Sequence, residues 1–269
     1  MASEELQFRL VVDKDLPRSL PGAVAFGDFD EAEGSVVYTS LPIFFSDLAL
    51  GRPLPLALAM RDLGGIDHVL VVALFLHREL VIHPSVVGLV SAVDLASRWG
   101  VAGLAHVDRD LARFLVFLSS FLPPGLPKKT LHERVPVAVQ WIQEYSQKGL
   151  LPALPPEADL PRILNFGTNG FVVAEASGLL EMAWVELFRQ GYLRGMVFSP
   201  SQSDRRRVLI GRKSVFLEMK LSQLGQVLNE AERAMGEPPE WKVGVNWLES
   251  PKGGTLIPVS NLMDVVLKF

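Results

Sequence analysis

Histidines and carboxylates, the side chains best suited to hold a metal ion, gather in the first half of the chain. Four of the five histidines lie close together in sequence, at His68, His77, His83 and His106. The acids beside them are Asp67, Glu79, Asp108 and Asp110. Oxygen ligands with some imidazole suit Mn²⁺ or Mg²⁺, and such an ion lowers the pKa of a bound water for attack on phosphorus. The pattern indicates metal-dependent chemistry.

A further pair of acids, Asp28 and Asp30, follows a predicted strand over 23–26. Ligands of open α/β sheets gather beyond the carboxyl ends of the strands, and a parallel strand over 69–76 would end at His77 on the same edge. The predicted ligands of one or two Mn or Mg ions are Asp28, Asp30, Asp67, His68, His77 and His106. The alternative is that the two acids close a turn and that the histidines lie at strand ends and in loops.

Cations and glycines in the second half could hold a phosphate. Arg205–Arg207 and the stretch 211–214 flank a predicted hairpin, and a glycine turn lies further on. Arginine grips phosphate with a bidentate fork, and turn N–H groups can meet an anion. The predicted phosphate-binding residues are Arg212, Lys213, Gly253 and Gly254. The alternative is a solvated turn that keeps a sheet edge from pairing with other chains.

Composition excludes several classes of function. The 269 residues carry a net charge of −4 and no cysteine, which excludes disulfide scaffolds, thiolate zinc sites and cysteine nucleophiles. An acidic balance argues against extended binding of nucleic acid. The chain also lacks the glycine patterns of P-loop and dinucleotide-binding proteins and the serine hydrolase elbow.

Apolar spacing and caps predict the elements of the first part. Strands are expected over 8–12, 23–26 and 69–76, the last an aliphatic run typical of a parallel strand buried on both faces. Helices are expected over 40–50, 85–99 and 108–122, with Asp108 as an N-cap. A further helix is expected to start at Pro136 and to end at Gly149. The predicted buried face of the 108–122 helix consists of Leu111, Phe114, Leu115, Leu118 and Phe121.

Prolines divide the chain. Four of them lie between residues 152 and 161, where they exclude helix and sheet interior. Beyond them we expect helices over 178–190, 222–235 and from Ser260, and strands over 193–198, 207–210 and 215–221. The predicted fold class is α/β, a parallel or mixed sheet with flanking helices over 1–150, followed by a smaller α+β domain over 151–269.

The order of these features resembles the DHH phosphoesterase superfamily. The stretch Phe26-Gly-Asp28-Phe-Asp30 has the spacing of that family's H-x-D-x-D motif, and Asp67-His68 is similar to the motif that names it. The resemblance implies an α/β domain with acidic and histidine metal ligands, a linker, and a smaller domain that binds substrate phosphate through a glycine-rich turn. Phe26 and Val69 stand where the family has ligand histidines, and the glycine turn lacks its histidine.

Two functions follow as hypotheses. The first is a metal-dependent phosphoesterase-like hydrolase that acts on a phosphorylated small molecule or a short oligonucleotide. The second, favoured by the missing ligand histidines, is a catalytically silent binding or assembly protein on the same scaffold. The expected partner is a small phosphorylated ligand or another protein, and a homo-oligomer stays open. The acidic N-terminus and the lack of an apolar run of about 20 residues predict a soluble, cytoplasmic protein with no membrane partner.

Overall fold

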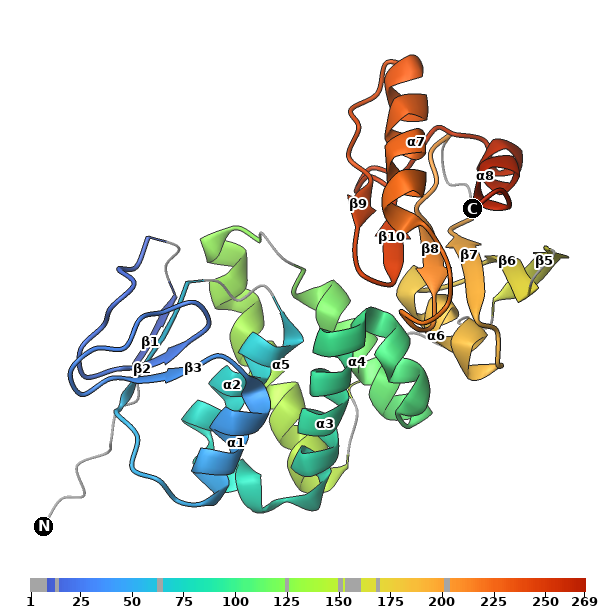
Figure 1. The fold of residues 1–269 in the computed structure, drawn as a ribbon. Coiled ribbons are helices and arrows are strands. Elements are labelled where there is room, and N and C mark those ends of the chain that lie inside the picture. The colour runs from blue at the N-terminus through green and yellow to red at the C-terminus, as the bar shows by residue number, and fades with distance from the viewer. Residues whose placement is uncertain are drawn as a thin grey trace, which may run out of the picture. The chain divides into compact units, whose positions relative to one another are not determined.

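The computed structural model describes residues 9–12, 15–61, 65–123, 126–149, 152, 161–167, 170–200 and 204–269. The chain forms two compact units, and each is discontinuous in sequence (Figure 1). The first comprises Met1–Asp94 and Phe114–Leu154, and the second comprises Leu95–Arg113 and Pro155–Phe269. Residues 95–113, which the sequence assigns to the first domain, therefore belong to the second unit. Most of the predicted linker, at 150, 151 and 153–160, lies outside the described residues.

The first unit contains a four-stranded parallel sheet with flanking helices, which confirms the predicted α/β class. The strands lie in the order β1-β4-β2-β3, and their bounds are Arg9–Val12 (β1), Val24–Phe26 (β2), Val36–Tyr38 (β3) and Ala57–Met60 (β4). Phe26 pairs in register with Met60 on one side and Tyr38 on the other, so these three residues mark the carboxyl ends of their strands. All three side chains are buried.

Helices supply the rest of the core of the first unit. They are α1 (Leu41–Ala49), α2 (Ile66–Leu76), η1 (Arg78–Ile82), α3 (Pro84–Trp99), α4 (Arg109–Phe121) and α5 (Lys128–Lys148), with α3 and α4 each running from one unit into the other. Asp108 caps α4 as predicted, because its Oδ1 accepts hydrogen bonds from the N–H groups of Asp110 and Leu111. Gly149 ends α5 with a left-handed φ of 67°. The predicted face of α4 is buried at Leu111, Phe114, Leu115 and Leu118, with Phe121 half-buried.

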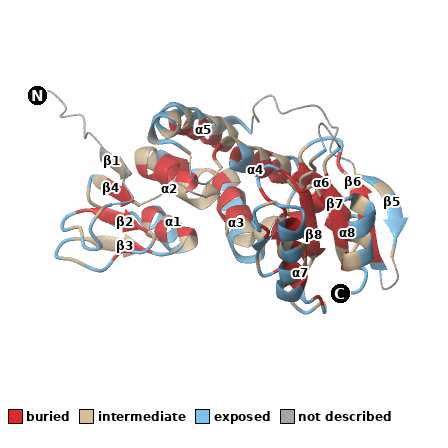
Figure 2. Ribbon diagram, turned by 90° about the horizontal axis from the view of Figure 1, so that it is seen from above, coloured by how far each residue is buried: buried red, intermediate tan, exposed pale blue. Residues whose placement is uncertain are grey.

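The prediction of a strand over 69–76 is wrong, because these residues form most of α2. All seven residues from Val69 to Phe75 are buried, and Figure 2 shows the buried middle of the helix between less buried ends. A helix enclosed on every side has no polar face, so its sequence lacks the 3.6-residue period and looks like a buried strand. The consequence for function is direct, since His77 ends a helix and does not lie at the edge of the sheet.

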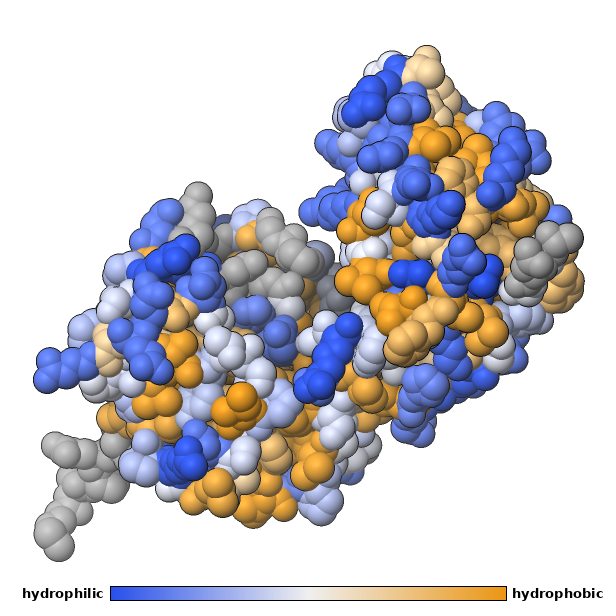
Figure 3. Space-filling model, viewed as in Figure 1, coloured by the Kyte–Doolittle hydropathy of each residue, from blue (hydrophilic) through white to orange (hydrophobic). Residues whose placement is uncertain are grey.

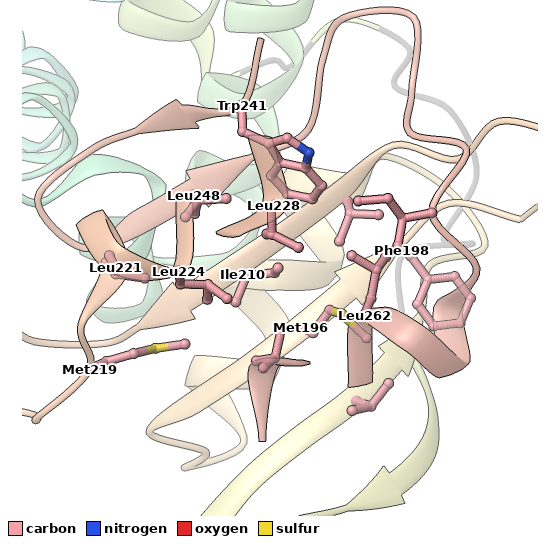
Figure 4. Close-up of a cluster of buried hydrophobic side chains, with 14 of the residues drawn as sticks. Met196, Phe198, Ile210, Met219, Leu221, Leu224, Leu228, Trp241, Leu248 and Leu262 are labelled. Atoms are coloured by element: carbon pink, nitrogen blue, oxygen red, sulfur yellow. The ribbon is translucent and has the colours of Figure 1, made fainter. Parts of the chain in front are cut away.

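The second unit contains a six-stranded mixed sheet in the order β5-β6-β7-β8-β10-β9. The strands are Arg162–Phe166 (β5), Phe171–Glu175 (β6), Arg194–Phe198 (β7), Val208–Arg212 (β8), Lys242–Val243 (β9) and Trp247–Glu249 (β10). Its helices are η2 (Gly100–His106), α6 (Leu180–Arg189), α7 (Leu221–Ala234) and α8 (Val259–Val266). One core cluster joins the sheet to α7 and α8, and Figure 4 shows its side chains meeting around Leu228, Ile210 and Leu262.

Three further sequence predictions are wrong in detail. Residues 215–221 form no strand but a turn that leads into α7, and Met219 and Leu221 are buried in the core cluster without a strand partner. Helix α5 begins at Lys128 and carries Pro136 in its interior. Helices α7 and α8 each begin one residue before the predicted start at Ser222 and Ser260, with Lys220 and Pro258 at their N-caps.

Among the described residues, the stretch Pro84–His106 is long and apolar enough to cross a bilayer by length and composition. It consists of α3 and the short helix η2, with a break at Gly100, whose φ is 65°. Its buried face includes Val86, Leu89 and Val93, and 39% of its most apolar window is buried inside the protein. The stretch is therefore weak evidence for a membrane span.

Candidate functional site

A cavity of about 370 Å³ opens in the first unit between β1, α2 and α5. Its apolar lining consists of Leu10, Val72, Leu76, Leu131, Val135, Pro136 and Val139. Three polar residues complete it, His77, His132 and Gln143. Pockets that bind small molecules start near 300 Å³ and have this character, an apolar wall with a few polar groups that fix orientation.

Helix α5 forms the longest wall of the cavity. Its lining residues recur at the spacing of one helix face, from Leu131 through Val135 and Val139 to Gln143. Pro136 lies on the same face and has no N–H, so it donates no hydrogen bond to the carbonyl of His132 four residues earlier. Both residues line the cavity and both are exposed, so the carbonyl of His132 lacks its usual helical donor in an open part of the lining.

His77 brings an imidazole from the end of α2. Its Nδ1 lies 3.5 Å from Oε1 of Glu79, and the side chain is about one-third exposed. This contact engages Nδ1 and leaves Nε2 as the ring atom that can meet a ligand. The sequence predicted a functional role for His77 with a metal ion, whereas the structure places it among apolar side chains beside a cavity.

The acids Asp28 and Asp30 lie on the surface. The side chain of Asp28 is 80% exposed and forms a long ion pair of 3.8 Å with Arg18. The N–H of Asp30 donates to the carbonyl of Arg18, which ties the loop together through the backbone. Phe29, between the two acids, is buried and lies under the guanidinium of Arg61 at 5.0 Å. The loop is therefore held by its aromatic residue, and its two acids face solvent.

Asp67 and His68 lie in the first turn of α2, next to the carboxyl end of β2. The imidazole of His68 meets the ring of Phe26 edge-on at 5.4 Å, and its Nδ1 lies 3.2 Å from Oδ1 of Asp67. Burial raises the pKa of Asp67, but the hydrogen bond and the charge of His68 outweigh it, so the pKa is lowered overall. The pair is thus a local contact at the edge of the sheet.

Helix geometry separates the predicted metal ligands. His68 and His77 are nine residues apart along α2, or about 14 Å at the rise of an α-helix. Ligands of one ion lie about 2–2.5 Å from it, so these two histidines do not share an ion. The exposed His106 belongs to the second unit. In the part of the chain that the structure describes, no three His, Asp or Glu side chains are grouped to hold a metal ion.

Tyr38, at the carboxyl end of β3, is a second perturbed group on this edge of the sheet. Its hydroxyl donates a hydrogen bond of 2.9 Å to Asp47, which also pairs with Arg52. Burial and the hydrogen bond to Asp47 raise the pKa of Tyr38 to about 12. The phenol stays neutral at any physiological pH and acts as a structural donor.

The predicted phosphate-binding residues lie at opposite ends of β8. Gly254 packs against the backbone of Arg206, before the strand, through the bridge between Arg206 and Thr255. Arg212 and Lys213 follow at the other end, roughly 20 Å away at the rise of a strand. Arg212 donates to the carbonyls of Leu217, Met219 and Val245, and Lys213 donates to that of Phe188. The structure does not bring these four residues together.

The basic run before β8 is paired with acids. Arg207 donates to both Glu181 and Glu249 at 2.8 Å, and Arg205 donates to Glu237 at 2.6 Å. Arg206 stacks over the ring of Phe198. These contacts give the run a structural role, but a different one from the predicted solvated turn at a sheet edge, because β8 lies between β7 and β10.

Sequence reasoning did not single out His132 or Gln143. His132 lies outside the histidine cluster, and Gln143 carries no charge. The available signal was Pro136, because a proline inside a helix frees the carbonyl four residues before it. That signal depends on knowing that α5 begins eight residues before Pro136.

Comparisons of the chain with models of known protein families, with curated proteins and with solved structures find no match. The resemblance to the DHH phosphoesterases therefore stays a prediction that rests on its two partial motifs.

Proposed function

We propose that the protein is a binding protein, whose first unit takes a small and mainly apolar molecule with one polar group into the cavity between β1, α2 and α5. The observation that carries this proposal is the cavity of about 370 Å³ with seven apolar and three polar lining residues. This function corresponds to the second sequence hypothesis, a binding protein without catalysis. The predicted cytoplasmic location is part of the proposal.

In this proposal the carbonyl of His132, which has no N–H of residue 136 to accept from, meets the polar group of the ligand, and it favours a donor such as a hydroxyl or an amine. A carbonyl that already lacks its helical partner gains a hydrogen bond from such a donor and repels an acceptor. His77 and Gln143 can each donate to or accept from the same group. The ligand class is therefore a short apolar chain or ring with a terminal donor.

The test is a titration with 1-octanol, followed by the methyl signals of Val72, Leu76 and Val135 in NMR spectra. We expect saturable shifts confined to the residues that line the cavity. Val139→Phe fills the cavity from its wall and should abolish the shifts. Val137→Phe adds the same ring on the same helix at a more exposed position outside the lining and should leave binding intact.

Leu131→Phe is a second blocking variant, at a half-buried position that tolerates a larger side chain if Val139→Phe does not fold. Linear, non-saturable shifts would contradict the proposal. Equal binding to both blocking variants and to Val137→Phe would contradict it as well.

A further inference from the structure

Two turns of the second unit each expose a large apolar side chain. Phe216, in the turn between β8 and α7, is 92% exposed, and Val245, in the turn between β9 and β10, is 69% exposed. Single apolar side chains on a surface need no explanation. Two exposed apolar side chains on turns that are held together by one residue do need an explanation.

Arg212 fixes the two turns together. Its Nη1 donates to the carbonyl of Leu217, next to Phe216, at 2.6 Å, and its Nη2 donates to the carbonyl of Val245 at 3.1 Å. One guanidinium thus holds the backbones of both turns, so the two exposed apolar residues belong to one corner of the unit. Figure 3 shows apolar side chains among hydrophilic ones on the second unit.

A hollow and several cations accompany this corner. The hollow has a volume of about 360 Å³, and its lining includes Arg212, Lys220, Ser222 and Val245. Lys213, Lys220 and Lys242 lie on or beside the two turns with Arg212, against the exposed acids Glu218 and Glu240. Lys213 donates to the carbonyl of Phe188, and Lys242 lies opposite Glu249 in the neighbouring strand, so Lys220 is the lysine that is most available. The corner is therefore apolar at its two tips and positive around them, in a chain whose net charge is −4.

We propose that this corner binds the surface of an anionic membrane, with Phe216 and Val245 in the interfacial layer and the exposed Lys220 and Lys242 against lipid headgroups. Apolar side chains ringed by cations are the features of such binding, and each lysine near an anionic surface adds attraction. A stable protein interface instead buries about 800 Å² of continuous surface on each partner, which two separate side chains do not offer.

This proposal revises the sequence-based expectation of no membrane partner. That expectation rested on the lack of a spanning segment, and binding at the surface needs none. The proposal is independent of the cavity in the first unit.

The experiment is co-sedimentation of the full chain with vesicles of phosphatidylcholine alone and with vesicles of equimolar phosphatidylcholine and phosphatidylserine. We expect binding to the mixed vesicles only, and weaker binding at higher salt because salt screens the lysines. Phe216→Ser should lower the partition coefficient at least about tenfold, since a phenyl ring leaves the interface. Lys220→Glu should lower it about fivefold or more.

Two matched variants serve as controls. Phe166→Ser removes another exposed phenyl ring of the second unit, and Lys268→Glu reverses another exposed lysine of that unit. Both should bind like the native protein. Failure of the native protein to bind mixed vesicles, or unchanged binding by Phe216→Ser, would overturn the proposal. The rival explanation is that the corner binds a second copy of the chain. Sedimentation velocity without vesicles tests it, because an oligomer that Phe216→Ser dissociates would assign the corner to self-association.

Discussion

Pro136 removes one backbone donor from α5, so the carbonyl of His132 lacks its usual helical partner. Both residues line the cavity of the first unit, and we propose that this carbonyl meets a ligand there. His77 and Gln143 add side chains that can orient a ligand. Asp28 and Asp30, which the sequence predicted as metal ligands, are exposed. Chemistry in this protein is therefore better sought in the cavity of the first unit than in its exposed acids.

Asp28 and Asp30 allow a direct test of the metal hypothesis. We expect the double variant Asp28→Asn with Asp30→Asn to melt at the native temperature, because Asp28 is exposed and its ion pair with Arg18 is long. We also expect no stabilisation of either protein by Mn²⁺. Scanning fluorimetry with and without MnCl₂ measures both effects. A rise in melting temperature that the native protein shows and the double variant lacks would restore these acids as metal ligands.

Tyr38 should make the protein sensitive to alkali. Its pKa in the folded protein is about 12 against an ordinary 10.0, so folding favours the neutral phenol. The stabilisation it provides is complete below pH 10 and is lost as the pH rises from 10 to 12. Urea unfolding across this range should show a steeper loss of stability in the native protein than in Tyr38→Phe. Parallel curves for the two proteins would show that the phenol is not held by Asp47.

Pro136 weakens α5 and, in the proposed function, leaves a backbone acceptor for the ligand, and substitution separates these two effects. Pro136→Ala restores an N–H to the helix interior and should raise the free energy of unfolding by about 1–3 kcal/mol. The His132 carbonyl then has an internal partner, so the preference of the cavity for 1-octanol over 2-octanone, expected at about two- to tenfold, should shrink. Calorimetric titration of both ligands measures it, and Val137→Ala is the control on the same helix. An unchanged preference in Pro136→Ala would mean that the carbonyl takes no part in binding.

The sequence predicts those elements whose ends carry local signals. Asp108 and Gly149 mark helix ends through contacts within a few residues, and the structure places both as expected. Helix α2 has no such signal, because Gly65 caps it without a side chain and its partners are distant in sequence. The stretch 215–221 alternates like a strand because Met219, in the turn, and Leu221, the first residue of α7, both reach the core. The cavity lay beyond sequence reasoning for the same reason, since β1, α2 and α5 come together only in the fold.

The division into units is the feature of the whole molecule that the sequence conceals. The proline-rich stretch predicted a single boundary between two domains. Residues 95–113 precede that boundary in sequence, but they belong to the second unit. Arg109 pairs with the buried Glu186 at 3.2 Å, and the short helix η2 packs on α6. The composition of residues 95–113 does not reveal which unit they pack in, because a helix has the same apolar spacing whichever core it packs against.

A fragment of residues 155–269 should therefore be incomplete. Without residues 95–113 it leaves Glu186 without Arg109 and α6 without η2, so it should melt well below a fusion that joins 95–113 to 155 by a flexible linker. Circular dichroism at 222 nm follows both melts. The same fusion with Arg109→Ala separates the ion pair from the apolar contacts. Identical melting of fragment and fusion would show that the inserted segment adds nothing to the unit.

The inserted segment also fixes an order of events on the ribosome. Arg109 is synthesised 77 residues before Glu186, an interval of roughly 4–15 s at about 5–20 residues per second. Throughout that interval Ala102 and Leu104, which are buried in the finished protein, have no α6 to cover them. The nascent chain thus carries exposed apolar surface at a defined length, and that length is where a chaperone would meet it.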